Sequence, residues 1–373
     1  MNKKDAILKG FEVHDTKHTM KRRSLHHYYR GRGTYMLTLV VKGRRPLLGK
    51  LVEVDPSAEL RGTVASLPSA ELRGTGAIVE KTELGRLIEE MEIKKIKHFY
   101  PMVDVWKVCI MPDHIHLIMR VNEDLPEGSH IGKIIAGFKQ GCNKAYWGIN
   151  PSAELRGTVA SLPSAELRGT GASLPSAELR GTVARNGLFE AGYNDKILLR
   201  DGQLENWKAY LDDNPRRLLI KRKNPHLFTV IRNMRVAGKE CQVVGNSFLL
   251  DVPDKVAVIV HRRYTEMEIT RLREEWLACG ERGGVLVSAA ISPDEKEVLR
   301  EAMNLEYRII LLRENGFPEL YKPSGESFYA CSEGRLLQVS PWGYHTEKKT
   351  ISREQCLELN AMAEMIAETP QRN

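Results

Sequence analysis

The sequence has no closely spaced pair of cysteines and no long apolar run. Its six cysteines are dispersed, with no C-x-x-C spacing, which argues against a zinc knuckle or a disulfide framework and favours a reducing setting. No window approaches 18 uninterrupted apolar residues, and residues 1–18 lack the apolar core of a signal peptide. We therefore expect a cytoplasmic protein that does not span a membrane.

Charge is unevenly distributed along the 373 residues. Of the 56 basic and 48 acidic side chains, residues 236–373 hold 17 and 22, which leaves 39 and 26 for residues 1–235. A strongly basic domain is typical of proteins that bind a polyanion, most often nucleic acid, although basic surfaces also serve solubility. The length suits two domains, which we place at 1–235 and 236–373.

The octamer PSAELRGT interrupts the first domain five times. Residues 56–77 and 151–172 are the same string of 22 amino acids, and a third copy of the unit extends the second tract to residue 184. Repeats of a solenoid diverge outside their packed positions, so identity throughout indicates recently copied DNA. Long loop insertions cost little closure entropy. We therefore interpret 56–77 and 151–184 as insertions in loops away from the active centre.

Without the repeats, the first half alternates apolar strands with one-sided helices. The order β-α-β-β-α indicates an α+β sheet with helices on one face. From residue 224 onward, short continuous apolar runs are separated by amphipathic segments, which predicts a parallel α/β sheet covered on both faces. The expected strands lie at 34–41, 103–110, 114–121, 256–260, 285–289, 308–312 and 336–340, and the first-half helices near 80–96, 131–147 and 204–212.

Two histidines stand out in the segment VCIMPDHIHLIMRV, residues 108–121. Side chains alternate along a strand, so His114 and His116 point to the same face while Ile115 points to the other. Imidazoles about 7 Å apart on one face can both reach one divalent ion. Two half-exposed histidines on a solvent face remain the alternative interpretation of this spacing alone.

A tyrosine and an amide in GQLENWKAYLDDNPRR, residues 202–217, are suited to the same site. Tyr210 and Asn214 are four residues apart and so share a helical face. A tyrosine phenol is a weak nucleophile near neutral pH and needs a phosphate already polarised by a cation. The pattern indicates a site for phosphoryl transfer in which the tyrosine and the side-chain amide approach one metal ion together.

Three blocks follow one another in the first half: RRSLHHYYRGRGTYMLTLVVKGRRPL (22–47), MPDHIHLIM (111–119) and AGYNDKILLRDGQLENWKAYLDDNPRR (191–217). In this order they resemble the REP-associated tyrosine transposases, a branch of the single-tyrosine HUH endonucleases. The resemblance implies a ferredoxin-like antiparallel sheet, Tyr210 as nucleophile, and a site for Mg²⁺ or Mn²⁺ with His114 and His116 as ligands, completed by Asn214. It further implies a 5′-phosphotyrosine intermediate, a single-stranded or hairpin DNA substrate and a homodimer.

Basic clusters and two aromatic residues are the candidate DNA contacts of the first domain. Cationic side chains supply phosphate affinity with little base information, and exposed aromatic rings stack on unpaired bases. Ordinary packing is the alternative for Tyr28 and Tyr29, and a solvated surface role is the alternative for each cation. The candidates are Arg22, Arg23, Tyr28, Tyr29, Arg30, Arg44, Arg45, Lys139, Arg216, Arg217, Lys221 and Arg222.

The second half, in its stretch 281–343, resembles the Rossmann-like core of the DprA and lysine-decarboxylase-like families. Those proteins bind nucleotides or single-stranded DNA through a glycine-bearing loop after a strand. The corresponding loop here, SAAISP at 288–293, lacks glycines that let a backbone approach a phosphate, so we assign no cofactor-binding residues. A regulatory or oligomerisation module, an aid to DNA binding and an enzyme remain open for this domain.

A metal-dependent single-stranded DNA transposase is the function that these patterns favour. A nickase of the relaxase or replication-initiator kind could use the same histidine pair, although the short spacing from Tyr210 to Asn214 favours the transposase. A DNA-binding repressor or adaptor that has lost cleavage is the alternative from a different class.

Overall fold

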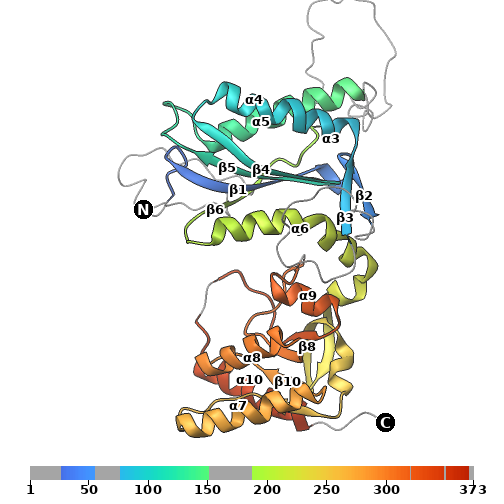
Figure 1. Cartoon of the computed structure of the whole chain (residues 1–373), viewed down its shortest axis with the longest axis vertical. Helices are drawn as coiled ribbons and strands as arrows, with labels where there is room; N and C mark the ends of the chain where they lie inside the picture. Colours follow the sequence, from blue (N-terminus) through green and yellow to red (C-terminus); the bar gives the residue numbers. More distant parts are fainter. Residues whose placement is uncertain (1–26, 55–75, 151–186, 320, 348–349, 369–373) are drawn as a thin grey trace, which may run out of the picture. The chain divides into compact units, whose positions relative to one another are not determined.

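The computed structural model describes residues 27–54, 76–150, 187–319, 321–347 and 350–368. The chain divides into two compact units, Met1–Leu219 and Ile220–Asn373, and each is described by itself (Figure 1). The division falls inside helix α6 (Gln203–Lys223), earlier than the expected boundary at 235/236. That expected boundary would cut strand β7 (Ile231–Val236), which pairs with β8 (Lys239–Gly245) in the sheet of the second unit.

The first unit is built on an antiparallel sheet of four strands. Strands β4 and β5 form a hairpin, and β1 lies on the other side of β5, with Thr38 opposite His116 and Val40 opposite His114. This register places the histidine strand at the centre of the sheet. In spatial order the strands are β4 (Val103–Met111), β5 (His114–Val121), β1 (Gly33–Val40) and β6 (Asn194–Ile197).

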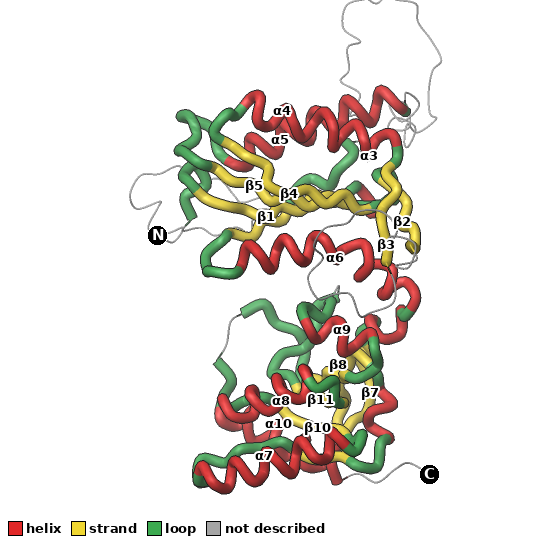
Figure 2. Tube along the Cα trace, in the orientation of Figure 1, coloured by secondary structure: helices red, strands yellow, loops and turns green. Residues whose placement is uncertain are grey.

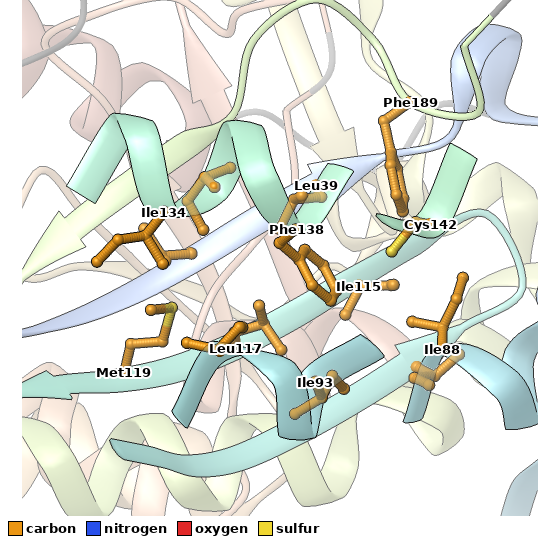
Figure 3. Packing of buried hydrophobic residues seen from close by; sticks show 14 of the residues in the cluster. Leu39, Ile88, Ile93, Ile115, Leu117, Met119, Ile134, Phe138, Cys142 and Phe189 are labelled. Atoms are coloured by element: carbon orange, nitrogen blue, oxygen red, sulfur yellow. The ribbon is translucent and has the colours of Figure 1, made fainter. Parts of the chain in front are cut away.

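Three α-helices and a π-helical turn cover one face of this sheet (Figure 1). The odd-numbered residues of β5, among them Ile115 and Leu117, are fully buried against Ile134 and Phe138 of α5 (Figure 3). Apolar residues recur every three or four positions along α5, which gives the helix one apolar face. The helical segments are α3 (Glu83–Leu87), η3 (Ile88–Glu92), α4 (Ile93–Phe99) and α5 (Ile131–Ile149).

Helix α6 packs on the opposite face, on the side toward which the histidines point. Its Trp207 and Leu211 are buried against Met36 of β1 and Ile118 of β5. The expected α+β class is confirmed, with α3 to α5 on one face as predicted and α6 added on the other. The helix also extends well beyond the expected range 204–212, through Pro215 to Lys223.

A two-stranded ribbon, β2 (Gly49–Val54) with β3 (Gly76–Lys81), is attached to this unit, and the short helix η2 (Lys42–Arg44) precedes it. Val54 pairs with Gly76 at the end of the ribbon, so residues 55–75 connect two adjacent strand ends. Gly76 and Ala77 therefore belong to β3, although the 56–77 insertion was expected to include them. The remainder of that insertion and the whole of 151–184 lie outside the described residues.

The second unit contains a mixed sheet, whose strands are yellow in Figure 2. Their order is β7-β8-β12-β11-β10-β9. The last four of these strands are parallel, which confirms the expected α/β class, and β8 joins β12 in the antiparallel direction. Short helices η5 (Pro225–Phe228) and η6 (Ser247–Asp251) flank β7 and β8. The parallel strands are β9 (Lys255–Ala257), β10 (Val285–Ser288), β11 (Arg308–Leu312) and β12 (Leu336–Ser340).

Helices cover both faces of this second sheet. Val285 and Val287 of β10 pack with Met362 of α10, whereas Leu286 packs on the other face with Trp276 of α7 and Val298 of α8. None of the helices in the described residues is both long and apolar enough to cross a membrane. The helices are α7 (Glu266–Glu281), α8 (Pro293–Asn304), α9 (Glu326–Ser332) and α10 (Arg353–Glu368).

Candidate active site

His114 and His116 stand side by side on β5, with ring centroids 4.8 Å apart. Each ring is held through its Nδ1 atom. The Nδ1 of His114 donates to Oδ1 of Asp113 at 2.6 Å, and the Nδ1 of His116 is hydrogen-bonded to the hydroxyl of Thr38 at 2.8 Å. Hydrogen bonds of this kind fix the tautomer and the orientation of a metal-binding imidazole. The Nε2 atoms are therefore the ones positioned to bind a ligand.

Tyr210 of α6 faces the same pair. Its ring centroid lies 5.8 Å from that of His116, with the rings edge to face. The side chain remains 37% exposed, so a polymer substrate can approach it. One turn later, Asn214 is buried, and its side-chain Nδ2 atom has no hydrogen-bond partner among the described residues. Its side chain lies near the Cys109 thiol, which is opposite His116 on β4. The structure thus brings Tyr210 to His116 and places Asn214 beside them on the sheet face under α6.

The electrostatic surroundings of the tyrosine are mixed. Burial raises the pKa of the Tyr210 phenol, and the positive charge of Arg217 acts in the opposite direction. The Arg217 guanidinium lies 5.6 Å from the centre of the Tyr210 ring, which is a cation–π distance. Arg217 follows Tyr210 by seven residues, or two helical turns, so both side chains lie on one face of α6. The cation is therefore placed to stabilise a phenolate.

The Asp113 carboxylate accepts hydrogen bonds from two side chains, His114 and Arg44. Burial alone raises its pKa, but hydrogen bonds from His114 and Arg44 outweigh that effect and hold the pKa at about 2. Arg44 Nη1 donates to Oδ2 at 3.0 Å, while His114 uses Oδ1. The carboxylate is therefore ionised at neutral pH and is shared between the histidine strand and the loop after β1.

One ion pair joins α6 to the sheet, and a second lies within the helix. Lys107 Nζ of β4 lies 2.6 Å from Oδ2 of Asp212, and Arg216 pairs with Asp213 at 3.3 Å. The adjacent acidic residues before Asn214 are therefore neutralised by two separate cations. Pro215 removes one backbone donor from the helix interior. The Lys107–Asp212 pair and the packing of Leu211 thus hold this part of α6 on the sheet.

The donor set suits a divalent ion with open coordination positions. No group of three histidine, cysteine or carboxylate side chains gathers as a metal centre among the described residues. The set here consists instead of two imidazoles with oriented Nε2 atoms and one side-chain amide. Imidazole and amide donors leave positions for substrate oxygens and water, as catalytic metal sites do. The residues present can therefore hold a divalent ion.

The expected DNA contacts fall into distinct environments. Tyr28 is 58% exposed, whereas Tyr29 packs against the core and donates its hydroxyl hydrogen to Asp195 at 2.9 Å. Lys139 donates to the carbonyl oxygens of Glu190 and Gly192, on a helix that covers the face opposite the histidines.

Several of the expected cations lie near the histidine face or at the end of α6. Arg44 pairs with Asp113, and Arg45 Nε donates to the Lys42 carbonyl oxygen at 3.2 Å. Arg30 precedes β1. Arg22 and Arg23 lie outside the described residues, and the last two turns of α6 carry Arg216, Arg217, Lys221 and Arg222.

Sequence reasoning assigned no chemical role to Thr38, Lys107, Cys109 or Asp113. Thr38 and Cys109 flank His116 in the sheet register, so only the strand pairing reveals them. Asp113 directly precedes His114 in the sequence, and this position was a usable signal. In the structure it is the residue that orients the first imidazole.

In the second unit, the loop after β10 has its backbone donors occupied by the chain itself. The buried carboxylate of Glu295 accepts from the N–H groups of Val260 at 2.9 Å, Ile291 at 2.6 Å and Ser292 at 3.3 Å. Backbone donors at a helix N-terminus of this kind are what a phosphate would otherwise use. The 288–293 loop, in which we assigned no cofactor-binding residue, thus binds an internal carboxylate.

Comparisons with known proteins find only remote likenesses. No protein-family model matches the sequence, and no curated protein matches it. One similar solved structure is a REP-associated tyrosine transposase bound to a REP hairpin, at 13% identity and a TM-score of 0.28, covering 52% of this chain and 74% of that one.

Two further solved structures are similar at the same level. One is DNA processing protein A from Helicobacter pylori, described for its single-stranded DNA binding, at 18% identity and a TM-score of 0.28 over 38% of this chain and 67% of that one. The other is a protein described as a transposase from Deinococcus radiodurans R1, at 12% identity and a TM-score of 0.23 over 52% and 97%. Likenesses this remote leave function to be argued from the site itself.

Proposed function

We propose that the first unit is a metal-dependent endonuclease and transposase that cleaves and rejoins single-stranded DNA through a tyrosine–DNA bond. The observation that carries this proposal is the placement of Tyr210 against His116, with ring centroids 5.8 Å apart, on the face where both histidines are oriented through Nδ1. A nucleophile beside a metal site is one arrangement that catalyses phosphodiester cleavage.

His114, His116 and Asn214 would hold the ion, and the ion when bound supplies charge that polarises a phosphate oxygen. Tyr210 Oη attacks the phosphorus, the bond from phosphorus to the 3′ oxygen breaks, and the tyrosine becomes linked to the 5′ phosphate. The phenol proton is lost to water and the released 3′ oxygen is protonated, so the step is balanced. Because the phosphodiester energy is kept in the new bond, the reverse attack by a 3′ hydroxyl rejoins strands without ATP.

Arg217 supports the same step from the helix. Its guanidinium favours the phenolate form of Tyr210, which burial alone disfavours. Thr38 and Asp113 keep the two imidazoles in place from the next strand and from the preceding turn. Strand β1 and the turn before β5 thus each supply a residue that orients a histidine, and α6 supplies the nucleophile.

The decisive experiment detects the covalent intermediate. Single-stranded hairpin oligonucleotides are incubated with the full chain and Mg²⁺ or Mn²⁺. Their label lies on the 3′ side of candidate cleavage points, so that it stays on the fragment that carries the 5′ phosphate. We expect a DNA–protein adduct that survives denaturant and is absent from the Tyr210→Phe variant. Tyr28→Phe is the matched control because Tyr28 is also an exposed tyrosine of this unit.

The outcome also separates the alternatives. An adduct that persists in Tyr210→Phe would assign the nucleophile to another residue. Tight hairpin binding without any adduct, under both metals, would favour a repressor or adaptor. We further expect cytoplasmic location and a homodimer, with the second unit as a regulatory or oligomerisation module, and size measurement in solution tests the dimer.

A further inference from the structure

Trp106 is a large aromatic residue on β4 that the protein core does not use. Its side chain is 45% exposed, and none of the hydrophobic clusters formed by the described residues includes it. The register of β4 on β5 shifts between Val105 and Lys107, which marks a β-bulge at this residue. Bulges redirect a side chain away from the regular strand pattern and are frequent beside active sites.

Arg120 shows toward which face Trp106 is turned. The Arg120 guanidinium lies 6.0 Å from the centre of the Trp106 ring, at a cation–π distance. Arg120 is four residues after His116 on β5, and strand side chains repeat every two residues, so both point to the same face. Trp106 therefore lies on the sheet face that carries the histidine pair.

The position of Arg120 is fixed by a second contact and its charge is available. Its Nη1 donates to the Thr34 hydroxyl at 3.0 Å. Asp104 lies opposite Arg120 in the register, but its carboxylate is bound by Lys97 and Asn122. Asp104 is thus already paired with Lys97. The Trp106 indole and the Arg120 guanidinium together form a surface that is aromatic and positively charged.

The distance from the histidines suits a strand of nucleic acid. Cys109 is the partner of His116 on β4, and Trp106 is three residues from Cys109 along that strand, or about 10 Å at the usual rise. A single strand whose scissile phosphate lay at the histidines would pass Trp106 within a few nucleotides. Exposed aromatic rings paired with cations are the usual platforms for unpaired bases.

We propose that Trp106 and Arg120 form a binding subsite for one unpaired base of single-stranded DNA next to the cleavage point. This subsite rests on the proposed function, because it takes the same substrate. The base stacks on the exposed part of the indole, while Arg120 supports the ring and contributes positive charge near the phosphates. The subsite selects for an unpaired nucleotide, since a base within a duplex has no free face to offer.

The test measures binding alone, in the Tyr210→Phe background and without added metal, so that cleavage plays no part. Fluorescence anisotropy of a labelled hairpin with an unpaired flank should show roughly tenfold weaker binding for Trp106→Ala, as loss of one stacked base predicts. Trp106→Phe should retain most of the affinity. Phe99→Ala is the matched control, because Phe99 is 69% exposed on α4, which covers the opposite face of the sheet.

An abasic scan of the flank separates stacking from damage to the fold. Removing one particular base should weaken binding to the Trp106-containing protein as much as Trp106→Ala does, with no further loss when the two changes are combined. Equal losses for blunt duplex DNA, or unchanged affinity of Trp106→Ala for the hairpin, would overturn the subsite. If Tyr210 forms an adduct while Trp106→Ala binds normally, only the subsite fails; if no adduct forms but the scan succeeds, only the cleavage proposal fails.

Discussion

Asp113 orients His114 directly, with 2.6 Å between Oδ1 of the carboxylate and Nδ1 of the ring. The two residues are neighbours in the chain, yet the contact depends on the turn between β4 and β5, which directs both side chains to the same place. Arg44 binds the other carboxylate oxygen from the loop after β1. The histidine strand, a turn and a distant loop are therefore connected through one carboxylate.

Removal of this carboxylate should weaken metal binding without unfolding the protein. Partners that orient a ligating histidine are typically worth 10- to 100-fold in metal affinity or activity, so we expect a loss of that order for Asp113→Ala. Isothermal titration with Mn²⁺ measures it. Asp104→Ala is the control, since Asp104 bonds Lys97 and Asn122 instead of a histidine. Equal Mn²⁺ affinity of Asp113→Ala and wild type would contradict the orienting role.

Arg217 should control the pH dependence of adduct formation. Burial raises the pKa of Tyr210 and Arg217 lowers it, so Arg217→Met should raise the pKa further and reduce the phenolate fraction at neutral pH. One unit of pKa corresponds to about tenfold in that fraction below the pKa. We expect adduct formation roughly three- to tenfold slower at pH 7.5, with the difference shrinking only where the pH reaches the raised pKa of Tyr210.

Single-turnover rates at saturating hairpin DNA measure this effect apart from DNA affinity. Arg222→Met removes the same charge near the end of α6 and should alter affinity without moving the pH profile. If both variants shift the profile equally, the effect belongs to general positive charge rather than to the contact between Arg217 and the Tyr210 ring.

Lys139 should make the stability of the first unit rise with pH over a defined window. Burial lowers its pKa to about 8, from a usual value of about 10.4. Between these values the unfolded chain binds more protons than the folded chain, so the free energy of unfolding increases with pH. Relative to Lys139→Met, the wild type should therefore gain about 1–3 kcal/mol between pH 7.5 and pH 10.5.

Calorimetric unfolding of both proteins across that window provides the measurement. The comparison with Lys139→Met removes the contribution of tyrosines and cysteines that titrate in the same range. A constant difference in unfolding temperature between the two proteins, from pH 7.5 to pH 10.5, would show that Lys139 keeps an ordinary pKa in the folded state.

The sequence predicted local relationships well because they depend on periodicity. Alternation along β5 placed His114 and His116 on one face, and the spacing of four residues placed Tyr210 and Asn214 on one side of a helix. Contacts between distant segments were not predictable in this way. Lys107 and Asp212 are far apart in the chain, and nothing in either segment indicates that β4 meets α6 there.

The face to which α6 belongs illustrates the same limit. Trp207 and Leu211 are apolar at helical spacing, which predicts a buried stripe but not the sheet face that receives it. Composition likewise identified Lys139 and Tyr29 as candidate DNA contacts, whereas the structure bonds them to Glu190 and Asp195 of this unit. The charge or aromatic character of a residue is known from its type alone. Its hydrogen-bond partners depend on which distant residues the fold brings next to it.

Residues 55–75 should be replaceable by a two-residue turn. Val54 and Gly76 are paired across the ribbon, so Asn-Gly between them makes a standard β-hairpin connection. A shorter connection costs less closure entropy, and the first unit should gain up to about 2 kcal/mol in unfolding free energy.

A variant that keeps the length but scrambles residues 55–75 is the control and should unfold like the wild type. If the short turn lowered the unfolding temperature or abolished Mn²⁺ binding, the repeated segment would have a structural role, whereas unchanged adduct formation would establish it as a tolerated insertion.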